Sequence, residues 1–352
     1  MKKHRKYREK KKRQVDLALL LLTLGAVMAA LLLVVVSSFS LVRYFSEKQE
    51  DPQTQGSEAD TANDGAEELP SESQSMPEEP VVRPQGGGAL ENYRAVRLDL
   101  GALETAQQLR AAADRARQEG YTAVVIDAKA ADGHLQYASA VPLAAELGLA
   151  DDQKLTARQL IRILHENDLF VTVRLLAFSD NAAAAADPAM ALKTTAGDSY
   201  AQDGALWLDP ASKAACGYAL SLLRELDHAG ADEISLSSFG YPLLAAEQLA
   251  QSEAQRYTAV SEFAESACLA LEEAVLSFEI TPQELIAPQS GRTGIDLAQL
   301  RQSAELFVLN CVGRVLTDNL RAAAAEYPVR LCTSDALADA DGFTGVAVWQ
   351  TS

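Results

Sequence analysis

Eight short apolar runs recur along this chain, and longer stretches with helical spacing separate them. Runs rich in Val, Ile, Leu and Phe that alternate with helices indicate a parallel sheet whose outer face is covered. Eight such repeats in about 260 residues predict a closed (β/α)8 barrel of the TIM type. The runs are Tyr93–Leu100, Thr122–Lys129, Phe170–Ala177, Asp232–Ser238, Val275–Ile280, Glu305–Asn310, Pro328–Thr333 and Gly345–Gln350.

An open, doubly wound sheet is the alternative for such an alternation. It is disfavoured because neither G-x-G-x-x-G nor G-x-x-x-x-G-K-[ST] follows any run. Three helical stretches have clear ends: the first stops at Gly120, the second opens on a Thr156 cap, and the third stops at Gly230. The last helices are predicted to be short, so we expect a partly irregular barrel over 90–352.

The chain begins with a basic head, Lys2–Arg13, followed by an almost uninterrupted apolar stretch, Leu17–Val36. Twenty residues of helix span roughly 30 Å, the thickness of a bilayer core. No convincing A-x-A cleavage site follows, and a buried core helix of this length is uncommon. We therefore predict a cytoplasmic head (1–14), an uncleaved single-pass membrane anchor (15–42), and everything beyond it outside the cell, because positive charge stays inside.

The segment 43–89 is acidic and rich in Pro, Ser, Gln and Gly. It lacks the apolar residues needed for a core, so a disordered tether is predicted. From Ser37 onward the chain has 22 Lys and Arg against 47 Asp and Glu. A surface this acidic repels phosphate backbones, which argues against nucleic acid as a partner.

The four cysteines are Cys216, Cys268, Cys311 and Cys332, without a C-x-x-C pair or a histidine at metal spacing. The pattern predicts no metal site and no cofactor. Each lies in an apolar context, where a free buried thiol is the commoner outcome. A disulfide between Cys311 and Cys332 stays open as an alternative, since the barrel is expected outside the cell.

Chemistry in a (β/α)8 barrel takes place at the carboxyl ends of its strands, where the loops converge. The loop after the third run, Phe178–Pro210, is the longest, and a connection of that length is usually functional or mobile. Polar and aromatic candidates at the strand ends are Asp99, Asp127, Lys129, Arg174, Ser237, Ser238, Glu279, Asn310, Thr333 and Trp349.

Four segments resemble a known family: "VVIDAKAADGHLQY", "FVTVRLLAFSD", "GALWLDPAS" and "DEISLSSFGYP". They are similar to the putative glycosyl hydrolase domain family of bacterial membrane-attached or secreted proteins, which are expected to be barrels related to the alpha-amylase type. The resemblance extends over Tyr93–Pro242 and implies a glycan or cell-wall polysaccharide as the partner. The matching positions are Asp127, Lys129, Gly133, Arg174, Phe178, Asp180, Gly204, Trp207, Asp209 and Pro210.

The sequence departs from this family at the fourth strand. Family members tend to have an acidic residue where Ser237 stands and an arginine where Gly240 stands. At the fifth strand they tend to keep an aspartate, and here Glu279 supplies the carboxylate. The resemblance therefore implies a barrel of hydrolase descent that lacks one expected acid.

Glycoside hydrolysis needs two carboxylates, about 5–5.5 Å apart for retention or 6.5–9.5 Å for inversion. Glu279 is the best candidate acid and Asp127 the best remaining partner, although strands two and five are expected on opposite sides of the barrel. Ser237 is a poor nucleophile without a neighbouring base. The predicted substrate-binding residues are Lys129, Arg174, Asp180, Trp207, Ser237, Asn310 and Trp349.

Several of these residues also have a purely structural explanation. Asp127, Lys129 and Arg174 could form an ion network at the barrel rim, and either tryptophan could simply cover the core. Three functions stay open: an active hydrolase, a barrel that binds a glycan without cleaving it, and a scaffold for envelope proteins. The missing carboxylate at Ser237 favours the second over the first.

Overall fold

The computed structural model describes residues 92–103, 105–335 and 341–349. The predicted head, anchor and tether, 1–89, lie outside the described residues. Within the described part, no helix has the length and apolar character needed to cross a membrane.

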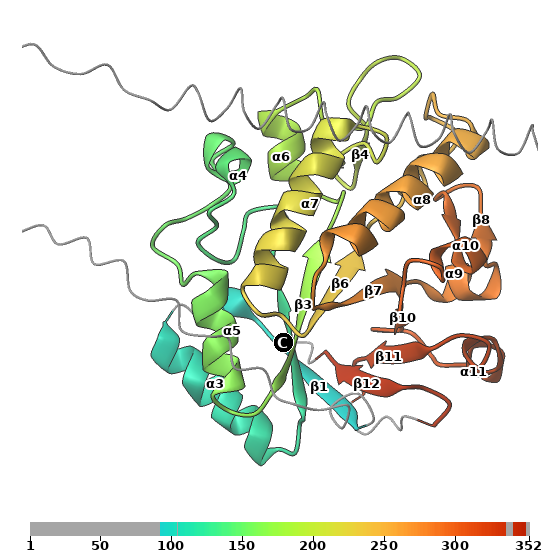
Figure 1. Cartoon of the computed structure of the whole chain (residues 1–352). Coiled ribbons are helices and arrows are strands. Elements are labelled where there is room, and N and C mark those ends of the chain that lie inside the picture. The colour runs from blue at the N-terminus through green and yellow to red at the C-terminus, as the bar shows by residue number, and fades with distance from the viewer. Residues whose placement is uncertain (1–91, 104, 336–340, 350–352) are drawn as a thin grey trace, which may run out of the picture. The chain divides into compact units, whose positions relative to one another are not determined.

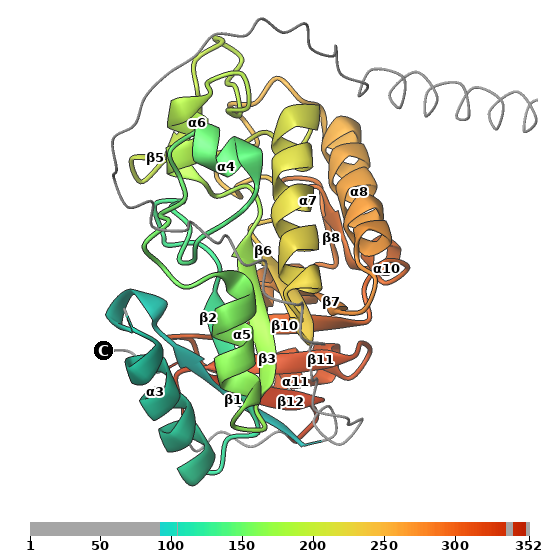
Figure 2. The same ribbon diagram turned by 60° about the vertical axis from the view of Figure 1, so that its left-hand side comes forward.

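Eight parallel strands close into a barrel (Figures 1 and 2). They follow chain order around the cylinder, and the last strand pairs with the first, Tyr93 opposite Gly345. All eight apolar runs are strands, so the predicted (β/α)8 fold is confirmed. The strands are β1 (Tyr93–Leu98), β2 (Ala123–Asp127), β3 (Phe170–Leu176), β6 (Glu233–Ser237), β7 (Val275–Ile280), β10 (Leu306–Asn310), β11 (Val329–Thr333) and β12 (Gly345–Val348).

Four long helices cover the first half of the barrel: α3 (Ala106–Gln118), α5 (Ala157–His165), α7 (Lys213–His228) and α8 (Glu253–Ala270). The predicted Thr156 cap is present, because its side chain accepts from the Gln159 amide. Helices in the second half are short, as predicted: α9 (Pro282–Ile286), α10 (Leu297–Leu300) and α11 (Asp318–Ala324). The remaining short elements are η2 (Leu100–Ala102), α4 (Pro142–Glu146), α6 (Asn181–Ala186), the β4–β5 hairpin (Ala201–Gln202, Ala205–Leu206) and the β8–β9 hairpin (Gln289–Ser290, Ile295–Asp296).

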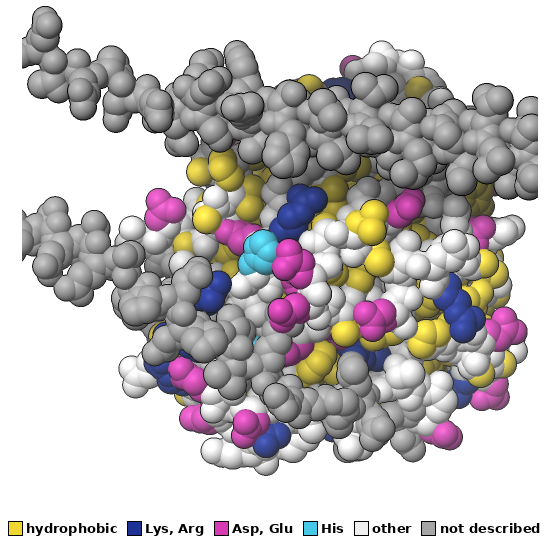
Figure 3. All heavy atoms as spheres, in the orientation of Figure 1, with side chains coloured by type: hydrophobic (Ala, Val, Ile, Leu, Met, Phe, Trp, Pro, Cys, Tyr) yellow, Lys and Arg dark blue, Asp and Glu magenta, His cyan; other side chains and the backbone are white. Residues whose placement is uncertain are grey.

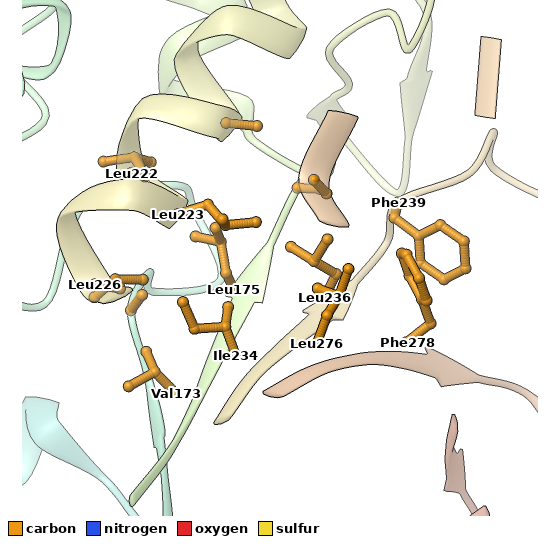
Figure 4. Packing of buried hydrophobic residues seen from close by; sticks show 14 of the residues in the cluster. Val173, Leu175, Leu222, Leu223, Leu226, Ile234, Leu236, Phe239, Leu276 and Phe278 are labelled. Carbon is orange, nitrogen blue, oxygen red and sulfur yellow. The ribbon is translucent and has the colours of Figure 1, made fainter. Parts of the chain in front are cut away.

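The main core lies between the barrel and its helices. Side chains alternate along a strand, so Val173 and Leu175 of β3 face α7, whose leucines point toward them (Figure 4). Nearby, the rings of Phe239 and Phe278 pack with centroids 4.6 Å apart. On the solvent side, Figure 3 shows one face on which acidic and basic side chains are interspersed with apolar ones.

The inside of the barrel is partly polar. A second apolar cluster fills it around Tyr93 and Phe170, and a buried ion pair joins Arg330 to Glu233. The Ser277 hydroxyl donates to the same glutamate over 2.7 Å, and the Arg330 guanidinium lies 3.7 Å from the centroid of the Tyr93 ring. The charges inside the barrel are therefore paired, as buried charges must be.

All four cysteines are free thiols. The buried-thiol interpretation is confirmed for Cys311 and Cys332, and the disulfide between them is absent. Cys216 is half-buried, but Cys268 is exposed on α8, so the prediction of burial is wrong for Cys268. Its outward position on the helix could not be read from the apolar residues around it.

Candidate functional site

The carboxyl end of the barrel is organised around Arg174 of β3. Its guanidinium donates to both oxygens of Glu279, over 2.5 and 3.0 Å. It also donates to Asp127 over 3.1 Å and to the Ser237 hydroxyl over 2.8 Å. The carboxylates of strands two and five are thus joined by one side chain, although strand order suggested that they would lie far apart.

Glu279 is held by more than its arginine. The Ser237 hydroxyl and the Asn310 side-chain amide donate to one of its oxygens over 3.1 and 2.9 Å. Burial favours the neutral acid, but the Arg174 charge and these hydrogen bonds outweigh it and lower the pKa of Glu279 from 4.5. Glu279 is therefore ionised at neutral pH, which disfavours the acid role predicted for it.

Asp127 has a second cation. Arg97 donates to it from its Nε over 2.7 Å, and both arginines lie over the ring of Trp349, each 4.9 Å from its centroid. Trp349 is thus engaged by guanidinium groups, and it lines a small cavity of about 20 Å³ that it shares with Arg174 and Glu279. The ion network that the sequence allowed at the barrel rim is present for Asp127 and Arg174.

Lys129 and Asp180 form a separate pair. Their side chains are completely buried and lie 2.6 Å apart. Asp180 also caps α6 by accepting from the Ala183 amide, and the Lys129 ammonium lies over the Tyr218 ring. Gly133 must be glycine here, because its φ is +100° and a Cβ would lie 2.1 Å from the Asp180 carboxylate. Lys129 and Asp180 therefore connect the loops that follow β2 and β3.

A cleft of about 560 Å³ opens beside Glu279, at the ends of β6, β7 and β10. It brings together five of the nine predicted residues, namely Arg174, Trp207, Ser237, Glu279 and Asn310. Asp127 instead lines a separate cleft of about 240 Å³ with Arg97 and Lys129. Arg174 lines both clefts and stands between the two predicted catalytic carboxylates.

Trp207 reaches the cleft from the long loop after β3. Backbone hydrogen bonds within this loop fix its shape: the Leu208 amide donates to the Phe178 carbonyl and the Asp209 amide to the Met190 carbonyl, each over 2.9 Å. The ring is half-buried, so one part of it packs and another part faces the cleft. A fixed, partly exposed indole is a suitable surface for the apolar face of a sugar.

Sequence reasoning missed several residues of the cleft. Glu284 of α9, Tyr241 and Thr293 line it, together with Arg314 from the loop after β10. Glu284 had a signal in "TPQE", a capping box that marks the start of a helix. No group of His, Cys, Asp and Glu in the described part of the chain is arranged to hold a metal ion.

One of the two serines at the end of β6, Ser237, has a structural explanation. Ser237 takes part in the Arg174–Glu279 network, and Ser238 has a φ of +51°, a conformation that a side chain rarely adopts. Gly240 faces the β8–β9 hairpin, where a Cβ would lie 2.8 Å from the Thr293 carbonyl oxygen. The hairpin therefore excludes the arginine that the family resemblance leads one to expect at this position.

Comparisons with known proteins agree with this architecture. Residues 95–306 match the model of the family described as a putative glycosyl hydrolase domain. No curated protein matches the chain. A hypothetical protein from Ruminiclostridium thermocellum is 25% identical over 52% of this chain and 96% of its own, with a TM-score of 0.47.

Glycosidases with a similar fold have lower sequence identity. A beta-N-acetylhexosaminidase from Bacteroides fragilis is 11% identical, with a TM-score of 0.51 over 74% of this chain and 61% of its own. An exo beta-N-acetylglucosaminidase from Vibrio harveyi is also 11% identical, with a TM-score of 0.50 over 69% of this chain and 41% of its own. At such identity the likeness shows the fold alone. Since the family model spans more than half of the sequence, the chain belongs to the putative glycosyl hydrolase domain family.

Proposed function

We propose that this protein binds a glycan of the cell envelope in the cleft beside Glu279. The cleft has the size range of a ligand site, and it combines a partly exposed indole with carboxylate, amide and hydroxyl groups. Such a combination suits a sugar, because the ring packs on one face while the polar groups bond its hydroxyls. Membership of the family supports a glycan as the ligand class.

The tether and the anchor belong to the same proposal. Leu17–Val36 fixes the protein in the membrane, and the barrel works on the outer side at the end of a flexible segment. A glycan at the cell surface would then be within reach of the cleft, without any need for the protein to diffuse freely.

One observation carries the choice of binding over hydrolysis by the predicted pair. Arg174 contacts both Asp127 and Glu279, so each carboxylate already has a positive partner, and the lowered pKa of Glu279 disfavours its role as the proton donor. Ser237 supplies no third carboxylate. Hydrolysis through Asp127 and Glu279 is therefore disfavoured.

The proposal is tested with the full-length protein in detergent, first on a glycan array and then by calorimetry on the glycans that bind. Trp207→Ala should weaken binding roughly ten-fold, because the sugar loses its aromatic partner. Trp207→Phe should restore most of the affinity, and Tyr257→Ala, a change of the same kind on the outer helix α8, should leave it unaltered. No binding to any glycan, or equal losses in all three variants, would overturn the proposal.

A further inference from the structure

The cleft contains a second carboxylate that the predicted pair does not use. Glu284 follows Glu279 by five residues, on the first turn of α9, and both line the cleft of about 560 Å³. Only 9% of Glu284 is exposed. Asp127, by contrast, belongs to the other cleft, behind Arg174. A ligand in the larger cleft would thus meet Glu279 and Glu284 without any rearrangement of the arginine.

Helix capping explains the position of Glu284 but not its charge. One of its oxygens accepts from the Thr281 amide and hydroxyl over 2.8 and 2.9 Å, which completes a capping box. Four helices in the described part of the chain begin with such a box, and in the other three the third residue is glutamine: Gln108, Gln159 and Gln255. Glutamine caps equally well. The acid occurs only in the box that lines the cleft.

The pKa values of the two glutamates are shifted in opposite directions. Glu279 lies among donors that keep it ionised. Burial raises the pKa of Glu284 above 4.5, the hydrogen bonds from Thr281 oppose that shift, and the nearby negative charge of Glu279 adds to it. A carboxylate whose pKa is lowered beside one whose pKa is raised is the division of labour that glycosidases use.

We infer that Glu284 is the proton donor, and Glu279 the nucleophile, of a retaining glycoside hydrolase site built within this single cleft. The inference rests on the proposed function, since it needs the glycan to lie there. In the first step a Glu279 oxygen forms a bond to the anomeric carbon while the bond to the leaving oxygen breaks, and that oxygen takes the Glu284 proton. In the second step Glu284 takes a proton from water, whose oxygen bonds the anomeric carbon and releases Glu279.

Glu284→Gln separates this role from capping, because glutamine keeps the capping box and lacks the proton. The full-length protein is assayed on a panel of phenyl and 2,4-dinitrophenyl glycosides in both anomeric forms. With phenyl leaving groups, which need protonation, turnover should fall about 10²–10⁴-fold. With dinitrophenyl leaving groups, which depart as anions, bond cleavage should be nearly unaffected. Glu265→Gln, the same change at an exposed position on α8, should leave both rates unaltered.

The pH profile gives a second readout that a structural role would not move. Activity requires Glu279 ionised and Glu284 protonated, so it should rise through the lowered pKa of Glu279 and fall through the raised pKa of Glu284. In Glu284→Gln the fall at higher pH should disappear. Product analysis by NMR should show retention of the anomeric configuration.

The outcomes distinguish this inference from the proposed function. A wild-type protein that binds an array glycan but cleaves neither that glycan nor any glycoside of the panel overturns the inference and leaves glycan binding in place. Equal losses on both leaving groups, an unchanged pH profile or an inverted product would overturn it as well. If the protein binds no glycan at all, both the proposed function and this inference are overturned.

Discussion

At the scale of single residues, Arg174 decides what the barrel mouth can do. Its planar guanidinium donates four hydrogen bonds to Asp127, Ser237 and Glu279 from one fixed position, whereas a lysine ammonium has only three N–H donors. The pKa of Arg174 is raised, because the two carboxylates and their hydrogen bonds outweigh the effect of burial. Glu279 and Arg174 are therefore both charged at neutral pH.

Arg174→Met keeps the length of the side chain and removes the charge. We expect the free energy of unfolding to fall by about 3–5 kcal/mol, because the buried Glu279 carboxylate loses its counter-ion. Urea unfolding followed by circular dichroism measures the change. The loss should be larger at neutral than at acidic pH, since protonated Glu279 no longer needs the cation.

The double variant Arg174→Met, Glu279→Gln serves as the control for that prediction. Removing both charges should recover part of the stability lost in the single variant, because no unpaired carboxylate remains. If the two single changes simply add, the arginine stabilises the barrel by some route other than this ion pair.

Composition and strand position were enough to predict which polar residues end the strands, but not which of them share a space. Lys129 and Asp180 lie 51 positions apart in sequence and meet inside the protein, which no local pattern reveals. Glu284 was overlooked for the opposite reason: its capping box explains the residue locally. Which polar side chains contact each other across a barrel depends on their length and direction, and these are known only from the folded structure.

At the scale of elements, the β8–β9 hairpin shapes the cleft wall. It packs against the loop after β6 so closely that Gly240 has room for no side chain, and the Tyr241 amide donates to the Thr293 carbonyl over 2.9 Å. The hairpin thereby occupies the region where a side chain at position 240 would lie.

Gly240→Ala tests this contact. The added methyl would overlap the Thr293 carbonyl, so we expect a loss of about 1–3 kcal/mol in the free energy of unfolding. Gly217→Ala is the matched control: Gly217 is exposed on α7 with nothing near its Cβ position, and alanine there should add about 0.5–1 kcal/mol. Thermal and urea unfolding report both changes. If Gly240→Ala and Gly217→Ala changed the free energy of unfolding equally, the hairpin would have moved to make room for the added methyl group.

The long elements could be predicted because their periodicity extends over many residues. Strands such as Phe170–Leu176 are mostly apolar, and α7 shows leucines at helical spacing. The β4–β5 and β8–β9 hairpins have strands of two residues each, which is too short for any period. These are also the segments that frame the cleft, so the sequence predicted the barrel better than its site.

At the scale of the whole molecule, the described barrel has two groups of paired charges on its strands and an apolar core between the strands and the helices. Arg330 and Glu233 form one ion pair inside the barrel, and Arg174 with its two carboxylates forms the other. Every one of these groups comes from a strand, so closure of the cylinder and pairing of the charges depend on each other. The eight apolar runs in the sequence were enough to predict that the barrel closes. The polar interior could not be predicted, because its residues are single polar positions within otherwise apolar strands.

The predicted topology of the full chain can be tested in intact cells that produce it. Protease added outside should cut within 43–89, because that segment has too few apolar residues to build a protective core, and should release a fragment of about the size of 90–352. A flexible segment of this length is expected to span roughly 35–40 Å, which would give a protease access to it. The basic head should stay with the membrane and be cut only after the cells are opened. A barrel that is protected in intact cells and cut only after lysis would place it on the same side as Lys2–Arg13, and an envelope glycan could then not be its ligand.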